Sequence, residues 1–510
     1  MAITHLKSKA NELLDQNPNW SVGVSIKEVA GATTGQNSVT LFVEKKKPLE
    51  EIDEADRFPS SVTIDGVVYP TDVVEQGKAV LIGWPRPPYP GQNFCYESVE
   101  DGAGAGYFVN PLSANNSVRR PLIGGIVCQS LPPGGYDGSW KSSGTLGGLV
   151  VDNTDNTICG LTNMHVVHAT PMSSVSQKGS SHFISDTGYT TYFSYLCCGA
   201  IYYDGLVDAP VAFGNNGSIE LTENIGNYPM YQMKRTQNNS VDEAFTATWK
   251  IGSVKRSSLY ETGFRAPGTN GMRIDSALIT IEPTNCKSTQ DGNSVNYHQI
   301  VAGESPEGTY EGTINGVDYG MEFATGDEIE RLLDTNFHTD ETGKVPETRD
   351  GTVGPLLFKS GARTGPVGSP GTLASYPPGQ ADWCNMKLSA FAIAPTNTSY
   401  DIDSSSVVYD CIFVRGTTIP AAGGDSGSLL CGRIPVSVDE GPPWDGTVTY
   451  TEYKIIGHVF AAFQGYWDDE YELGSELVAA RIDNIAEDLD IRAYRGAGTL
   501  EFATLENKQT

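Results

Sequence analysis

Short stretches rich in β-branched and aromatic residues recur along most of this sequence, and turn-forming residues separate them. The chain has 57 glycines and 29 prolines among its 510 residues, and both residue types interrupt helices and mark turns. Strand-like runs bounded in this way are typical of proteins built mainly from β-sheets. We therefore expect a mainly β fold with few helices, in a chain long enough for about two to four domains.

The N-terminal part, residues 1–83, predicts a small α+β domain. Residues 4–16 place three leucines and an alanine on one face of a short helix. Four strand-like runs follow, at residues 21–29, 38–44, 61–64 and 67–69. Asp65 and Gly66 predict a tight hairpin turn between the last two runs, because both residue types accept the positive φ that such a turn needs.

A proline-rich segment separates this unit from the rest of the chain. Residues 84–119 begin Trp-Pro-Arg-Pro-Pro-Tyr-Pro-Gly, which cannot sustain a sheet ladder and predicts a stiff linker. We assign residues 120–492 to the main β domain and residues 493–510 to a solvated tail. Two long polar stretches, near residues 170–225 and 283–350, are interpreted as insertions into the main domain.

Within the main domain, strand-like and helical patterns can be told apart at several places. Strands are predicted at residues 146–152, 157–163, 251–256, 412–418, 428–432 and 454–463. One helix is predicted at residues 476–489.

The charge of the chain limits the partners it can have. A formal net charge of −28 argues against binding to nucleic acid or to an anionic membrane, since both need a basic footprint. The first residues carry no apolar signal-peptide core, and no run approaches the roughly 18 apolar residues of a membrane span. We expect a soluble cytoplasmic protein, or a virion protein if a phage encodes the chain.

Metal and cofactor motifs are not found in the sequence. Nine cysteines at scattered spacings match neither a zinc site nor a disulfide framework, so we expect reduced and mostly buried thiols. Residues 152–156 predict a hairpin turn rather than a calcium loop, because the terminal bidentate acid is missing. With no phosphate loop either, we expect no cofactor and no metal.

The segment Gly-Asp-Ser-Gly-Ser at residues 424–428 is the first candidate for catalytic chemistry. Ser426 can act as a nucleophile if a base takes its proton and a pair of donors stabilises the oxyanion. Gly424 permits a turn that aims the backbone amides of Gly424 and Ser426 into one small space. The alternative interpretation is a plain glycine- and serine-rich β-turn.

A general base must come from one of seven histidines, which are His5, His165, His168, His182, His298, His338 and His458. His165 follows the strand-like residues 157–163, at a place suited to hold an imidazole beside a cleft. An α/β-hydrolase would have to use His458, which lies inside an apolar strand. A subtilisin-like order would need the acid before His165. The order His165, acid, Ser426 therefore favours the chymotrypsin class.

The acid that orients the histidine has two candidates. Asp208 and Asp275 each come immediately before an apolar, strand-like run. Asp208 lies nearer to His165 in the sequence, and Asp275 requires a long insertion between the two. Either aspartate can instead make a turn hydrogen bond at a strand edge.

Several segments together have the pattern of a known family. They are Gly-Thr-Leu-Gly-Gly-Leu-Val at residues 144–150, Leu-Thr-Asn-Met-His-Val at residues 161–166 and Gly-Asp-Ser-Gly-Ser-Leu at residues 424–429. In this order they resemble the core of trypsin-like serine peptidases, and more narrowly a bacterial and phage branch related to the plant narrow-leaf protein. Residues 359–365, 42–48 and 70–74 resemble the same branch.

The resemblance implies a chymotrypsin-like double β-barrel with long insertions, preceded by the small N-terminal domain. It also implies a serine endopeptidase that acts through a His-Asp-Ser triad and an acyl-enzyme. In the branch, an Ile-Gly strand comes shortly before the triad aspartate, as residues 251–256 come before Asp275 here. The resemblance therefore implies His165, Asp275 and Ser426 as the triad, rather than a triad completed by Asp208.

Two departures from the family limit what can be carried over. Secreted trypsins are activated when a new N-terminus pairs with the aspartate before the serine, but residues 120–125 begin with a poorly cleavable Arg-Pro bond. Activation by cleavage is therefore not implied, and Asp425 is left to pair elsewhere. Pro420 stands where trypsins keep a specificity aspartate, so a preference for Lys or Arg substrates is not supported.

We expect a serine endopeptidase that acts on a peptide or protein substrate, alone or as a homo-oligomer or part of a larger assembly. The first alternative is a catalytically weak or inactive structural protein, such as a virion or assembly component that reuses the fold. The large polar insertions suit that role. A third hypothesis is an esterase or other acyl hydrolase with the same triad.

Overall fold

The fold is described from a computed structural model. It describes residues 2–17, 20–29, 32–43, 45–75, 79–81, 124–130, 143–163, 166–167, 193–195, 201–203, 229–231, 250–257, 274–281, 322–332, 357–362, 365–367, 380–388, 406–415, 424–439, 447–463, 476–494 and 501–502. The protein is mainly β, as the sequence predicts, with helices only at a few places in this part of the chain. None of the helices among these residues is long and apolar enough to span a membrane.

The N-terminal unit has the predicted helix and hairpin. Its elements are α1 (Ala2–Gln16), β1 (Ser21–Val29), β2 (Ala32–Val43), β3 (Ser61–Ile64) and β4 (Val67–Glu75), with short 3-10 helices at Leu49–Glu51 and Glu54–Asp56. Leu6, Ala10 and Leu13 are buried on the inner face of α1. Asp65 and Gly66 have φ values of 50° and 79°, which confirms the tight turn between β3 and β4.

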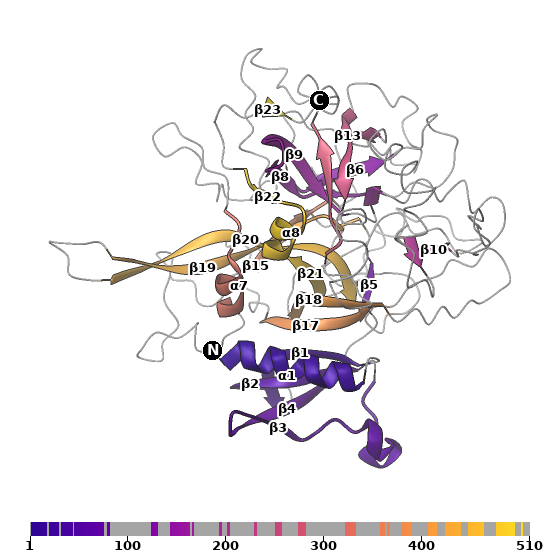
Figure 1. Ribbon diagram of the computed structural model, residues 1–510, viewed down its shortest axis with the longest axis vertical. Coiled ribbons are helices and arrows are strands. Elements are labelled where there is room, and N and C mark those ends of the chain that lie inside the picture. The colour runs from indigo at the N-terminus through magenta and orange to yellow at the C-terminus, as the bar shows by residue number, and fades with distance from the viewer. Residues whose placement is uncertain are drawn as a thin grey trace, which may run out of the picture.

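A 12-stranded sheet joins this unit to the C-terminal half of the chain. Its other strands are β5 (Ala79–Leu81), β15 (Leu357–Gly361), β16 (Gly365–Val367), β17 (Gln380–Leu388), β18 (Ser406–Arg415), β19 (Leu429–Asp439), β20 (Thr447–Phe463) and β21 (Leu477–Arg481). β1 pairs with two strands, since Val22 lies opposite Leu41 of β2 and opposite Asn385 of β17. Figure 1 shows α1 and β1 directly against β17, so the N-terminal unit continues the sheet of the main domain.

A nine-stranded sheet forms the other half of the main domain. Its strands are β6 (Ile126–Ser130), β7 (Ser143–Leu146), β8 (Gly148–Asp152), β9 (Thr157–Thr162), β12 (Pro229–Tyr231), β13 (Lys250–Ser257), β14 (Ala277–Thr280), β22 (Ile491–Ala493) and β23 (Glu501–Phe502). β10 (Phe193–Tyr195) and β11 (Ile201–Tyr203) form a separate hairpin within the first predicted insertion. The strands predicted around residues 146–163 and 251–256 are confirmed by β7, β8, β9 and β13.

The predicted helix at residues 476–489 is wrong in its first part. The chain forms β21 (Leu477–Arg481) there, and only then α8 (Ile482–Asp488). Residues 477–480 are all buried, because β21 lies between β18 and β20 in the sheet. A short, uninterrupted apolar run fits a buried strand as well as a helix, so periodicity alone did not separate the two.

Two segments interpreted as solvated or peripheral contribute to the sheets or the core. In the second predicted insertion, α7 (Gly326–Leu332) buries Ile329 and Leu332. Just before it, the Ala324 N–H donates to the Ile455 carbonyl of β20 at 2.8 Å. In the predicted tail, β23 pairs in parallel with β9. The predicted linker at residues 84–119 lies outside the described residues, and the predicted domain bounds stay a prediction.

Partly buried ion pairs hold α1 against the main domain. Lys7 Nζ lies 2.8 Å from Glu330 Oε1 of α7, 3.1 Å from Asp410 Oδ1 of β18 and 5.0 Å from the centre of the Trp383 ring. Arg481 also reaches Asp410, with 3.1 Å between the guanidinium and Oδ1. Burial alone would raise the pKa of Asp410, but Arg481 and Lys7 hold it well below its usual range.

Replacing Lys7 should therefore loosen the N-terminal unit. We expect Lys7→Met to lower the free energy of unfolding by about 1–3 kcal/mol at neutral pH, because two partly buried carboxylates lose a partner. Lys9→Met is the matched control. It removes the more exposed pair with Glu12, and its effect should be within about 0.5 kcal/mol. Urea unfolding followed by tryptophan fluorescence measures both.

The effect of Lys7→Met should depend on pH. Because the pKa of Asp410 is lowered by folding, its stabilisation is complete above about pH 4 and is lost as the pH falls further. The difference between Lys7→Met and the natural chain should accordingly shrink in acid. Equal stabilities of Lys7→Met and Lys9→Met at pH 7 would contradict this account of α1.

Candidate active site

The turn that contains Ser426 is stabilised by hydrogen bonds to its own backbone, and two glycines allow its conformation. Gly424 and Gly427 have φ values of 106° and 97°, in the region that favours glycine. The Ser428 N–H donates to the Asp425 carbonyl at 2.9 Å, and Ser428 Oγ donates to the same oxygen at 2.5 Å. Ser426 is buried within this turn, and β19 begins directly after it.

Thr145 binds the turn from the nine-stranded sheet. Its N–H donates to the Ser426 carbonyl at 2.6 Å, and its Oγ1 donates to the Gly424 carbonyl at 2.8 Å. Thr145 Oγ1 also accepts a hydrogen bond, at 2.9 Å, from the N–H of Ala362, which follows β15. A Cβ at Gly427 would clash with the Thr145 carbonyl, so the approach of the two segments requires glycine there. The turn therefore joins the two sheets.

The carboxylate of Asp425 has a lysine partner inside the protein. Lys359 Nζ lies 2.9 Å from Asp425 Oδ2, and both side chains are fully buried. A Cβ at Gly361 would clash with Asp425 Oδ1, so this part of β15 also lies against the carboxylate. Burial lowers the pKa of Lys359, and the charge of Asp425 opposes that shift. Asp425 thus pairs with a residue of the segment 359–365.

Asp275 lies buried just before β14 and is reached from β9. Asn163 Nδ2 donates to the Asp275 carbonyl at 2.5 Å, and Thr162 of β9 lies opposite Ala277 of β14. The residue after Asp275 makes a further contact, with 2.9 Å between Ser276 Oγ and His458 Nδ1. The strand pairing of β9 with β14 therefore sets the place of Asp275.

His458 of β20 connects the Asp275 segment to the Ser426 turn. Its Nε2 lies 3.0 Å from the Gly427 carbonyl, and its Nδ1 faces Ser276 Oγ and also Asn163 Nδ2 at 3.3 Å. The structure thus brings Asp275 and Ser426 into one hydrogen-bonded neighbourhood. Sequence reasoning set His458 aside. The available signal was a histidine within the otherwise apolar run at residues 455–463.

The predicted base His165 lies outside the described residues, as do Asp208 and Pro420. Asn163 and Val166 on either side of residues 164–165 are described. Asn163 contacts Asp275 and His458, as above, and the Val166 N–H donates to the Asn163 carbonyl at 3.3 Å. A Cβ at Gly144 would clash with Val166 and would lie 2.7 Å from the Ser426 carbonyl. The two flanking residues therefore lie near the Ser426 turn.

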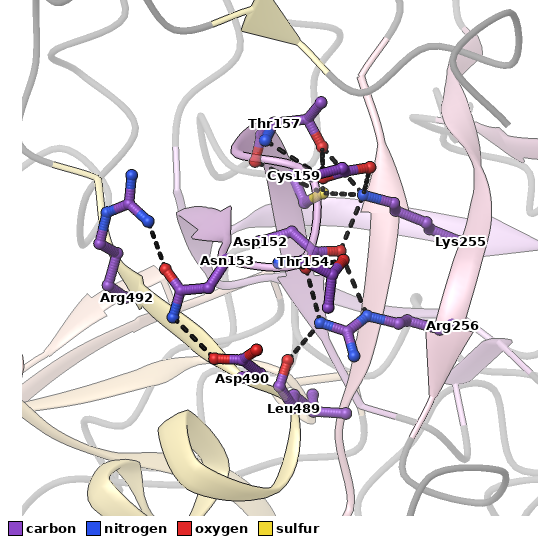
Figure 2. Close-up of polar contacts among 11 residues, drawn as sticks. Asp152, Asn153, Thr154, Thr157, Cys159, Lys255, Arg256, Leu489, Asp490 and Arg492 are labelled. Carbon is purple, nitrogen blue, oxygen red and sulfur yellow. Dashed lines mark hydrogen bonds and ion pairs between the residues drawn. The ribbon is translucent and has the colours of Figure 1, made fainter. Parts of the chain in front are cut away.

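A second polar cluster, at the β8–β9 hairpin, is structural (Figure 2). The buried carboxylate of Asp152 lies 2.7 Å from Lys255 Nζ and 2.7 Å from an Arg256 guanidinium nitrogen. Burial alone would raise the pKa of Asp152, but hydrogen bonds from Lys255 and Thr154 outweigh it and lower the pKa. Arg256 also donates to the Leu489 carbonyl, so the cluster ties the hairpin to β13 and the end of α8.

The same hairpin turn holds the acidic stretch considered as a calcium loop. Asn156 has a φ of 58°, and β8 and β9 pair up to the register Asp152–Thr157, which confirms the predicted turn. Among the described residues, no group of three or more His, Cys, Asp or Glu side chains could hold a metal ion.

The described cysteines are poor nucleophiles. Cys128, Cys159, Cys384, Cys411 and Cys431 are free and buried. Burial raises the pKa of the Cys128 and Cys159 thiols to about 12, far from the thiolate form that attacks carbonyl carbons.

Comparisons with known proteins identify no family for the chain. No protein-family model matches it, and no curated protein sequence matches it either.

The Lys359–Asp425 pair gives a stability prediction. Lys359→Met should lower the free energy of unfolding by about 3–5 kcal/mol, because the Asp425 carboxylate is left buried without its cation. Adding Asp425→Asn removes that charge and should recover part of the loss. Thermal unfolding of the two variants and the natural chain measures the effect. A Lys359→Met single variant as stable as the natural chain would contradict the assigned pairing.

Proposed function

We propose that this protein is a serine endopeptidase of the chymotrypsin class, with Ser426 as nucleophile, His165 as general base and Asp275 as the orienting acid. One observation carries the proposal. A residue within two positions of each proposed triad member, namely Asn163, Ser276 or Gly427, contacts the imidazole of His458. Segments far apart in the sequence are thus gathered around one point, as a catalytic triad requires.

The strand pairings support a double β-barrel. In the nine-stranded sheet, the pairings run from β8 through β9, β14, β13, β12 and β6 to β7. Only Gly147 separates β7 from β8, and its N–H donates to the Leu161 carbonyl of β9 at 2.9 Å. The β7 end and the β8 end of this path therefore both meet β9, which supports a sheet that curves toward a barrel.

In the 12-stranded sheet, one pairing path returns to its first strand, which is typical of a closed barrel. β17 pairs with β18, β18 with β21 and β21 with β20. β5 then pairs with both β20 and β17, which joins the two ends of the path. The Ser426 turn lies between the two paths, because Thr145 of β7 and Val459 of β20 both hydrogen-bond to it. Chymotrypsin-class peptidases have their active site between two barrels.

The proposed reaction proceeds through an acyl-enzyme. His165 takes the proton of Ser426 Oγ as it attacks the peptide carbonyl, and the amides of Gly424 and Ser426 hold the oxyanion. The protonated His165 then gives its proton to the leaving amine, and Asp275 stabilises the imidazolium. Water attacks the acyl-enzyme in the second half of the reaction, with His165 again as the base. The residues of this reaction need no metal or cofactor.

The Lys359–Asp425 pair bears on how such an enzyme is regulated. In secreted trypsins a new N-terminus neutralises the aspartate before the nucleophile. Here Lys359 is in contact with that carboxylate, so the turn has its cation without a cleavage. The proposal is accordingly an endopeptidase that needs no zymogen step, acting on a peptide or protein substrate.

Labelling with a fluorophosphonate probe tests the proposed function. We expect the natural chain to be labelled, and Ser426→Ala and His165→Ala to lose the label. Ser61→Ala, at the exposed first residue of β3, is the matched serine control and should label normally. Absence of labelling in the folded natural chain would instead favour the structural or assembly protein. Digestion of casein separates an endopeptidase from an esterase with the same triad.

The acid is tested by two asparagine variants. Asp275→Asn should lower the labelling rate by about 10⁴-fold, because the base loses its orientation and the charge that stabilises it. Asp208→Asn should leave the rate near that of the natural chain. If only Asp208→Asn abolished labelling, Asp275 would not be the triad acid.

A further inference from the structure

His458 is a buried imidazole that the proposed reaction does not use. It lies in β20, with Leu429 of β19 opposite it on one side and Ala480 of β21 on the other. The other buried side chains of β20 between residues 455 and 462 are apolar: Ile455, Ile456, Val459, Phe460, Ala461 and Ala462. Filling space in this strand requires no polar ring, so the polar contacts of His458 call for an explanation.

The contacts define the tautomer of His458. Its Nε2 faces the Gly427 carbonyl, which can only accept, so Nε2 carries the proton and donates to it. On the other side, the amide nitrogen of Asn163 can only donate, and it faces Nδ1. Nδ1 is therefore the acceptor, and Ser276 Oγ–H donates to it at 2.9 Å. Both ring nitrogens are used, in opposite senses.

Each partner of His458 adjoins a residue of the proposed triad. Gly427 follows Ser426, Ser276 follows Asp275, and Asn163 comes two residues before His165. The 163 and 276 segments belong to the nine-stranded sheet, whereas His458 belongs to the 12-stranded sheet. The imidazole is thus a hydrogen-bonded bridge between the nucleophile turn and the segments of the proposed acid and base.

The backbone around His458 makes this bridge rigid. The Val459 N–H donates to the Ser428 carbonyl at 2.8 Å, and the Gly427 N–H donates to the Val459 carbonyl at 2.9 Å. Because β20 is held on both sides by β19 and β21, the ring has a fixed position from which to hold the Gly427 carbonyl. A side-chain displacement of about 1 Å in a catalytic group can lower a rate by roughly 100-fold.

We propose that His458 is a positioning residue for the proposed serine peptidase. As the neutral Nε2–H tautomer, it fixes the distance between the Ser426 turn and the Asp275 segment. This inference rests on the proposed function, since positioning has meaning only if Ser426 reacts. His458 acts through Gly427, Ser276 and Asn163, and its loss should lower the rate of acylation without weakening the binding of substrate.

The test measures acylation of Ser426 by a fluorophosphonate probe, separated into the maximal rate kinact and the half-saturating concentration KI. His458→Leu introduces an apolar side chain of similar size and removes all three hydrogen bonds of the ring. We expect kinact to fall by about tenfold or more and KI to stay within about twofold. Ile456→Ala is the matched control. It lies on the same strand and should lower the melting temperature while leaving kinact unchanged.

Two conservative variants separate the hydrogen bond at Nε2 from those at Nδ1. His458→Gln can donate from Nε2 toward the Gly427 carbonyl, and His458→Asn can accept from Ser276 at the position of Nδ1. We expect each to recover part of the kinact lost in His458→Leu. If His458→Leu does not fold, these two variants provide the test. We expect the kinact of each to lie below that of the natural chain.

The outcomes distinguish this inference from the proposed function. A natural chain that the probe does not label would overturn the proposed function, and this inference with it. A labelled natural chain, together with His458 variants that fold and react at its rate, would overturn the positioning role alone. Ile456→Ala and a His458 variant with the same melting temperature can also be compared directly. If both show the same fall in kinact, the role of His458 is purely structural.

Discussion

The buried ion pair between Lys359 and Asp425 is the interaction on which the geometry around Ser426 depends. An ammonium group and a carboxylate that are both removed from water are tolerated only as partners. Their contact fixes β15 against the turn, and Thr145 holds the same turn from the other sheet. The carboxylate belongs to the residue before the serine. A change in its pairing would therefore shift the position of the Ser426 hydroxyl. Local glycines make this close approach possible, at Gly361 beside the carboxylate and at Gly427 beside Thr145.

Much of the local structure could be predicted from the sequence. The apolar face of α1 and the Asp65-Gly66 turn depend on neighbours within a few residues, which periodicity and turn chemistry report. The helix predicted over residues 476–489 failed because the buried surroundings of β21 come from β18 and β20, and no local pattern encodes them. Secondary structure was therefore predictable where its causes are local.

The candidate site was predictable in part, for the same reason. The Gly-Asp-Ser-Gly turn and the aspartate before β14 could be identified as candidates because a few neighbouring residues are enough to recognise each of them. The partner of Asp425 and the contacts of His458 could not be derived, since they join residues separated by 66 and by as many as 295 positions. His458 had a local signal only in its contrast with the apolar residues around it. That contrast indicated an unusual residue but gave no information about what it contacts.

The pairing of β1 with β17 has a consequence for how the chain is made. β1 leaves the ribosome early, but its partner strand begins about 360 residues later, at Gln380, which corresponds to roughly 20–70 seconds of synthesis. During that interval the N-terminal unit has a helix and a hairpin but also an open strand edge, the kind of edge that recruits other chains. In the nascent protein this edge therefore stays uncovered until the C-terminal strands arrive to pair with it.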